Sequence, residues 1–228
     1  MSGFIEALLG ASIPVIPEVK VHSADGVSLL GDRSPVAIAA AYQAAGAGCV
    51  SVVTGRWFGG DLRLLADITA RCDLPVLQKD FLTRESQLVH ARDVGAAAVL
   101  LTAALVPGRV LATLVDKALL LGLTPFVEVV SEAEIAAVPH PGECVLAVNN
   151  KDIRLRERGP ADLGRSEQLL PVVRATGCRA PVSASGIERS EQVTRLVEAG
   201  YTAVLVGTAL LRSPNPAAWL SHRAGVPR

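Results

Sequence analysis

Short apolar segments rich in Val, Leu and Ile alternate along the chain with longer segments that have helical spacing of apolar residues. The short segments are almost continuously apolar, which is typical of parallel strands covered on both faces. The eight predicted strands span residues 13–20, 48–54, 75–79, 97–101, 124–129, 144–149, 181–185 and 203–207. The eight predicted helices span residues 34–45, 61–71, 84–94, 108–121, 132–138, 164–176, 190–199 and 214–222.

This alternation predicts a fold of the α/β class, a single (β/α)8 TIM barrel. An open doubly wound sheet usually has fewer strands and a glycine-rich loop after the first one. Here the first predicted strand ends in Glu-Val-Lys and no such loop follows. The length of 228 residues suits one barrel, so we expect a single domain over residues 1–228.

The amino-acid composition limits the kinds of molecule that this protein is expected to bind. Half of the residues are apolar, the formal net charge is zero and no run of like charges occurs, which disfavours nucleic acid and anionic membrane surfaces. No apolar segment approaches the roughly 20 residues of a membrane span, and the first residues lack a secretory signal. The four cysteines are widely spaced without a Cys-x-x-Cys pair, so neither disulfides nor a metal site is favoured. We expect a cytoplasmic protein whose partner is a small molecule.

Lysine is rare in this chain, with four residues against eighteen arginines. Three of the four, Lys20, Lys79 and Lys151, come where a predicted strand ends. The pKa of a lysine amine shifts readily on burial, so lysine can donate a proton, whereas arginine stays protonated. Three lysines at strand ends therefore indicate acid–base or anion-binding chemistry.

Two carboxylates belong to the same strand ends. Glu18 precedes Lys20 by two residues and shares a strand face with it. Glu128 interrupts an apolar segment, where a charge is unfavourable unless it is paired or functional. Taken singly, each carboxylate is equally consistent with a structural ion pair. Because barrel enzymes place their chemistry at the carboxyl ends of the strands, these lysines and glutamates together predict a pocket of at least two amines and two acids.

The last two predicted strands each run into glycine and a hydroxyl residue just before a helix. Backbone N–H groups at such positions bind anions, and the loops after strands seven and eight are the usual phosphate site of these barrels. The sequence therefore predicts a phosphorylated substrate. The residues expected to hold its phosphate are Ser185, Gly186, Gly207 and Thr208.

These segments resemble indole-3-glycerol-phosphate synthase, the decarboxylating (β/α)8 cyclase of tryptophan biosynthesis. The resemblance extends from about Phe4 to Trp219. Its most specific parts are Lys-Asp-Phe at 79–81 and Asn-Asn-Lys-Asp at 149–152. The other segments that carry it are 15–20, 51–54, 57–60, 75–78, 127–129, 183–187 and 205–207.

The resemblance implies a carboxyphenylamino-deoxyribulose phosphate as substrate, which closes an indole ring and loses CO2 and water. It implies that Lys79 is the general acid and Glu128 the general base. Lys20 would pair with the substrate carboxylate and share the acid role, with Glu18 orienting it. The further binding residues that it implies are Asn149 for a sugar hydroxyl, Ser23 for the phosphate, and Lys151, Phe81, Trp57 and Phe58 for other parts of the substrate.

Trp57 and Phe58 are equally consistent with a cap on the barrel rim. The resemblance implies no metal and no organic cofactor, and we expect a monomer or weak homodimer.

The chain departs from the family pattern at four places. Ala184 stands where the family usually has Glu, and Gly55 where it usually has Asp. Residues 21–26 replace a usual Arg-x-Ser-Pro-Ser-x-Gly and bring Asp25 near the expected phosphate. Residues 1–12 are interpreted as a shortened N-terminal helical extension. Loss of one acid–base group typically lowers rates by about 10²–10⁴-fold.

Three alternatives follow from these departures. One is a paralogue of secondary metabolism with the same Lys/Glu core and another phosphorylated substrate, which the Ala- and Arg-rich composition of a GC-rich genome also suggests. Another is a barrel that isomerises or dehydrates a sugar phosphate with Lys79 and Glu128. The third is a non-catalytic phosphate-binding barrel.

Overall fold

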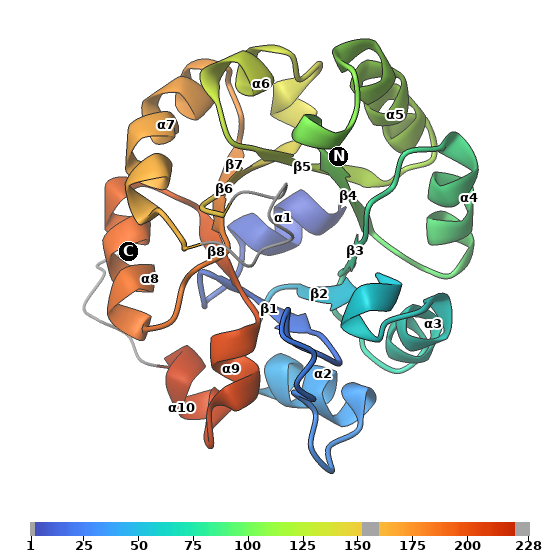
Figure 1. Ribbon diagram of the computed structural model, residues 1–228, viewed down its shortest axis with the longest axis vertical. Helices are drawn as coiled ribbons and strands as arrows, with labels where there is room; N and C mark the ends of the chain where they lie inside the picture. The colour runs from blue at the N-terminus through green and yellow to red at the C-terminus, as the bar shows by residue number, and fades with distance from the viewer. Residues whose placement is uncertain (1–2, 152–159, 222–228) are drawn as a thin grey trace.

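The computed structural model describes residues 3–151 and 160–221 and shows a closed eight-stranded barrel surrounded by helices (Figure 1). Each strand is parallel to its neighbours, and β8 closes the barrel by pairing with β1. The predicted (β/α)8 barrel is therefore confirmed. The strands are β1 (Val15–Val19), β2 (Val50–Val53), β3 (Val76–Lys79), β4 (Ala98–Thr102), β5 (Thr124–Val129), β6 (Val145–Asn149), β7 (Ala180–Ala184) and β8 (Ala203–Val206).

Helices follow the strands as the apolar spacing predicted. Ser34 caps α2 by accepting from the Ala37 N–H, and Asp61 caps α3 by accepting from the Leu64 N–H. The helices are α1 (Gly3–Leu9), α2 (Pro35–Ala44), α3 (Leu62–Thr69), α4 (Glu85–Asp93), α5 (Gly108–Leu120), α6 (Glu132–Ala136), α7 (Leu163–Ala175), α8 (Ser190–Ala199), α9 (Thr208–Arg212) and α10 (Pro216–Ser221). Short 3-10 turns lie at η1 (Arg56–Phe58), η2 (Ala103–Leu105) and η3 (Pro141–Glu143).

The segment after β8 differs from the prediction of one helix over 214–222. Instead, the short α9 begins directly after Gly207, and α10 follows. Ser213 between them is extended, as expected for a residue before proline. Residue 222 lies outside the described residues, as do residues 152–153 of the motif after β6.

Two apolar layers hold the barrel together. Alternate strand residues such as Leu77 and Phe126 fill the barrel interior, and the remaining strand residues pack beneath the helices. Phe4, Ile5 and Leu8 of α1 belong to the interior layer, together with the first residues of several strands. Helix α1 therefore closes the amino end of the barrel, and the carboxyl end is left for the site.

None of the helices in the described ranges is long and apolar enough to cross a membrane.

Candidate active site

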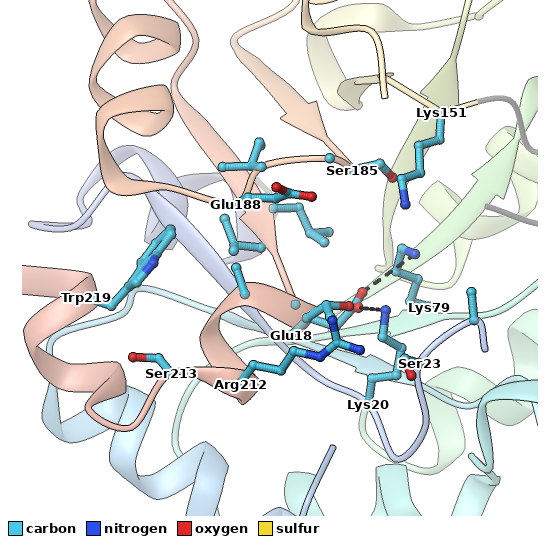
Figure 2. A pocket seen from close by; sticks show the side chains of 18 of the residues that line it. Glu18, Lys20, Ser23, Lys79, Lys151, Ser185, Glu188, Arg212, Ser213 and Trp219 are labelled. Carbon is cyan, nitrogen blue, oxygen red and sulfur yellow. Dashed lines mark ion pairs between the residues drawn. The ribbon is translucent and has the colours of Figure 1, made fainter. Parts of the chain in front are cut away.

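A cavity of about 660 Å³ opens at the carboxyl end of the barrel (Figure 2). It is lined by residues at the ends of β1, β3 and β8 and in the segments that follow β1, β6, β7 and β8. Nine of the predicted site residues line it, together with others that the sequence did not single out. The predicted ones are Glu18, Lys20, Lys79, Lys151, Ser23, Ser185 and Gly186, joined by Gly207 and Thr208 at the end of β8.

The floor of this cavity is a carboxylate between two amines. The Glu18 Oε1 atom lies 3.2 Å from the Lys20 Nζ atom, and the Glu18 Oε2 atom lies 3.6 Å from the Lys79 Nζ atom (Figure 2). All three side chains are more than nine-tenths buried. Because buried charges require compensation, the Glu18 carboxylate offsets the cost of burying two amines at the cavity. Two cations around one anion make this floor attractive to an anionic ligand.

The space for Glu18 depends on Gly207. A β-carbon at position 207 would lie 2.4 Å from the Glu18 Oε1 atom and 3.1 Å from its carboxyl carbon. Glycine at the end of β8 therefore lets the carboxylate stand between the two lysines, in addition to lining the cavity.

Glu128 does not line this cavity but lines a smaller pocket together with Lys79, and it is 2% exposed. Its Oε2 atom accepts a hydrogen bond of 3.2 Å from the Asn149 side-chain amide, whose oxygen in turn accepts from the Lys151 N–H at 2.9 Å. Asn149 thus orients Glu128. Asn149 is itself 1% exposed and is not among the cavity-lining residues, so its sugar-hydroxyl role stays a prediction.

An aromatic pocket adjoins the cavity. Trp57, Phe58 and Phe81 line it together with Lys79 and Glu128. The Trp57 ring stacks on the Phe81 ring with centroids 5.0 Å apart. Its volume of about 20 Å³ holds roughly one water molecule. As it stands, the pocket is too small for a substrate ring, and Trp57 on its wall is 58% exposed.

Lys79 is the residue that the cavity and the aromatic pocket share. An aromatic group and a polar chain of one ligand would therefore meet at its amine. Phe58, on the aromatic side, also contacts Lys20, whose Nζ atom lies 5.2 Å from the ring centroid.

The loop after β7 has an unusual backbone. Ser185 has a φ of 67° and Gly186 a φ of 75°, both in the left-handed region that only glycine adopts readily. The buried Asn150 side chain holds this loop by donating to the carbonyls of Ala184 and Ser185 at 3.0 and 3.1 Å. A strained residue kept in place by a buried amide is typical of a functional site.

Sequence reasoning missed several residues of the cavity wall. Arg212 of α9 extends toward the cavity (Figure 2), and Glu188 and Trp219 also line it. Asp25 lines it too, in keeping with the sequence prediction that it lies near the phosphate. A basic residue one helical turn after the Gly-Thr pair was the available signal for Arg212. It was overlooked because α9, with five residues, is too short for a periodic pattern.

Two of the residues that depart from the family pattern, Ala184 and Gly55, have well-defined neighbours in the structure. Ala184 is fully buried in the interior layer and pairs in register with Asn149 and Leu205. Ala184 is absent from the residues that line either pocket. Gly55 lies beside Asp80, whose Oδ2 atom accepts a 3.0 Å hydrogen bond from the Thr54 hydroxyl.

Comparison with known proteins agrees with this geometry. The family model of indole-3-glycerol phosphate synthase matches residues 1–222. The chain is 39% identical over 209 residues to the indole-3-glycerol phosphate synthase of Chromobacterium violaceum, covering 91% of this chain and 77% of that one. It is 37% identical over 209 residues to that of Laribacter hongkongensis, covering 91% and 78%. It is also 37% identical over 227 residues to indole-3-glycerol phosphate synthase 2 of Streptomyces coelicolor, covering 97% and 84%. With a family match over nearly its whole length and a barrel that carries the expected charged residues, the chain belongs to the indole-3-glycerol phosphate synthase family.

Proposed function

We propose that the protein is a carbon–carbon lyase that converts 1-(2-carboxyphenylamino)-1-deoxyribulose 5-phosphate into indole-3-glycerol phosphate, CO2 and water. The observation that carries this proposal is the position of Lys79, whose side chain lines both the aromatic pocket and the cavity. The aromatic ring of the substrate and its sugar chain must meet at the atom where the new bond forms. A proton donor at that junction is what ring closure requires.

The first step joins the ring carbon that bears the carboxylate to the ketone carbon of the sugar chain. Lys79 donates a proton to the ketone oxygen, which becomes a hydroxyl as the C–C bond forms. The carboxylate then leaves as CO2, and its electron pair returns to the ring. Lys20, held 3.2 Å from Glu18, pairs with the carboxylate until it leaves.

The second step removes water. After taking up a proton from water to replace the one given to the ketone oxygen, Lys79 protonates the departing hydroxyl, which leaves as water. Glu128 accepts the proton that the five-membered ring loses as it becomes aromatic. Asn149 holds the Glu128 carboxylate in one orientation through the 3.2 Å hydrogen bond. Acid and base thus face the same aromatic pocket, since Lys79 and Glu128 both line it.

The phosphate occupies the far end of the cavity in this proposal. Ser185, Gly186, Gly207 and Thr208 contribute hydroxyls and backbone N–H groups there, and Arg212 adds a positive charge. The phosphate fixes the sugar chain so that its ketone reaches Lys79.

The two alternative functions, a sugar-phosphate isomerase or dehydratase and a non-catalytic binding protein, leave some of these residues without a role. Isomerisation or dehydration of a sugar phosphate gives no role to the aromatic pocket or to a second lysine beside Glu18. A binding protein without turnover gives no role to Glu128, which lines that pocket.

Incubation with the carboxyphenylamino-deoxyribulose phosphate, followed by indole fluorescence and product chromatography, tests the proposal. An indole product supports it, and recovery of unchanged or merely isomerised substrate contradicts it.

We place the reaction in tryptophan biosynthesis and the protein in the cytoplasm. All four cysteines are free and buried, as is usual for proteins that stay in a reducing compartment. Burial raises the pKa of the Cys49 thiol to about 12, so this thiol stays protonated and unreactive. A monomer or weak homodimer remains our expectation for the assembly.

Replacing Arg212 with alanine is expected to raise KM about tenfold to a hundredfold while kcat changes little, because a phosphate contact binds substrate and transition state alike. Steady-state kinetics with the same substrate measure both constants. Arg195→Ala is the matched control, since this exposed arginine on α8 pairs with Glu167. An unchanged KM in the Arg212→Ala protein would place the phosphate elsewhere.

Replacing Gly207 with alanine is expected to lower kcat/KM about a hundredfold, because the added methyl group moves Glu18 from its place between the lysines. Gly108→Ala is a suitable control, since a β-carbon there meets no atom within 4 Å. Circular dichroism verifies that both proteins fold. Full activity in folded Gly207→Ala would mean that the position of Glu18 does not matter.

A further inference from the structure

The loop between β1 and α2 folds back as a small hairpin over the cavity. The Ser23 N–H donates to the Val27 carbonyl at 2.9 Å, and the Leu29 N–H donates to the Val21 carbonyl at 2.8 Å. Ser23 is buried at the base of this hairpin, whereas Asp25 is exposed at its tip. Both residues line the cavity.

The single hydroxyl proton of Ser23 is already engaged. Its Oγ atom donates to the Asp25 Oδ1 atom and also lies 3.1 Å from the Val27 carbonyl oxygen. A serine hydroxyl has one proton to donate, and a phosphate oxygen only accepts. Ser23 therefore binds a phosphate only after its proton turns away from Asp25.

Asp25 also places a negative charge in the cavity where the phosphate of a ligand is proposed to bind. The Ser23 hydrogen bond, followed by a backbone hydrogen bond, lowers the pKa of Asp25 from its ordinary value, and the charge of Arg212 acts in the same direction. Asp25 thus carries its negative charge at neutral pH, in the same cavity as Ser185, Gly207 and Arg212.

We propose that Asp25 is a specificity-determining residue that competes with phosphate for Ser23 and Arg212. The inference rests on the proposed function for the position of the phosphate. In the free protein the carboxylate takes the Ser23 proton and faces the Arg212 charge. When the substrate binds, the Asp25 side chain turns outward from the hairpin tip and releases both groups.

Such a competitor discriminates between the whole substrate and small anions. Without it, a cavity that holds Lys20, Lys79, Lys151 and Arg212 would bind inorganic phosphate readily. The substrate displaces Asp25 because its carboxylate and ring make additional contacts at Lys20 and the aromatic pocket, whereas free phosphate lacks them. Specificity here comes from a repulsive element and not only from attraction.

Glu188 provides a matched comparison. It is likewise an exposed carboxylate on the wall of the same cavity. Its backbone N–H donates to Gln192, but its carboxylate does not hydrogen-bond to Ser23 in the described structure. Removing Glu188 therefore changes the cavity charge by the same amount as removing Asp25 without freeing Ser23.

The experiment is a titration of the folded full-length protein with inorganic phosphate, followed by calorimetry or by the fluorescence of Trp219, which lines the cavity. Asp25→Ala is expected to lower the Kd for phosphate about tenfold, whereas Glu188→Ala lowers it less than about threefold. Adding Ser23→Ala to Asp25→Ala is expected to remove most of the gain.

Equal gains in Asp25→Ala and Glu188→Ala would overturn the proposal, because the effect would then be one of net charge alone. An unchanged or larger Kd in Asp25→Ala, or no phosphate binding by any variant, would also overturn it. The outcome is separable from that of the proposed function, since the titration requires no turnover. Indole formation without the Asp25 effect would reject only this inference. The Asp25 effect without indole formation would reject only the reaction.

Discussion

Lys79→Ala is expected to lower kcat by about 10³-fold or more, because the amine donates both to the ketone oxygen and to the departing hydroxyl. The same change leaves the Glu18 carboxylate with Lys20 as its remaining lysine partner, 3.2 Å away. The Ser185 and Gly207 segments lie outside this change, so inorganic phosphate is still expected to bind. Indole fluorescence under single-turnover conditions measures the rate, and calorimetry measures the phosphate affinity.

The chain offers a matched control for this variant. Lys117 on α5 is the one lysine that does not line either pocket, and its amine lies 3.6 Å from the exposed Glu85 carboxylate. Lys117→Ala is expected to keep its activity within about twofold, as exposed pairs contribute little. Normal turnover by folded Lys79→Ala would remove Lys79 from the mechanism and leave the acid role to Lys20.

Glu128→Gln is expected to lower kcat about 10²- to 10⁴-fold with little change in KM. Glutamine has nearly the same shape and its side-chain oxygen still accepts from Asn149, which donates to Glu128 at 3.2 Å. The negative charge is lost, and with it the capacity to accept a proton. The rate of indole formation at saturating substrate measures this effect.

Glu132→Gln is the comparison for this variant, because this exposed glutamate follows the same strand but lies on the surface of α6. It is expected to behave as the unaltered protein. A Glu128→Gln protein with undiminished kcat would show that another group, or solvent, accepts the ring proton.

Much of the fold was predictable because its signals are local. Parallel strands covered on both faces are nearly continuous in apolar residues, and all eight appear at the predicted places within a few residues at their ends. The strand ends then placed Glu18, Lys20 and Lys79 at one opening, since the carboxyl ends of all barrel strands point the same way. The parallel order β1-β2-β3 thus brings the Glu18 and Lys79 side chains together although they are 61 positions apart in the sequence.

The finer features of the site depend on side-chain contacts that periodicity does not encode. The hydrogen bond from Asn149 to Glu128 follows from the register of β5 against β6. The stacking of Trp57 on Phe81 joins two loops that are not adjacent in sequence. The hydrogen bond from Ser23 to Asp25 depends on the conformation of the hairpin turn; the Asp25-Gly26 pair signals a turn but does not specify this side-chain contact. These contacts depend on the three-dimensional arrangement of the backbone, which the sequence pattern does not specify.

The central claim is that this barrel forms the indole ring with loss of the substrate carboxylate at Lys79. The most direct measurement uses substrate labelled with ¹³C in the anthranilate carboxylate, and compares labelled CO2 with indole-3-glycerol phosphate in the unaltered and Lys79→Ala proteins. We predict one labelled CO2 for each indole formed, and loss of both products together in the variant. Substrate that is bound but returned with its label intact, or an indole yield that does not depend on Lys79, would contradict the account.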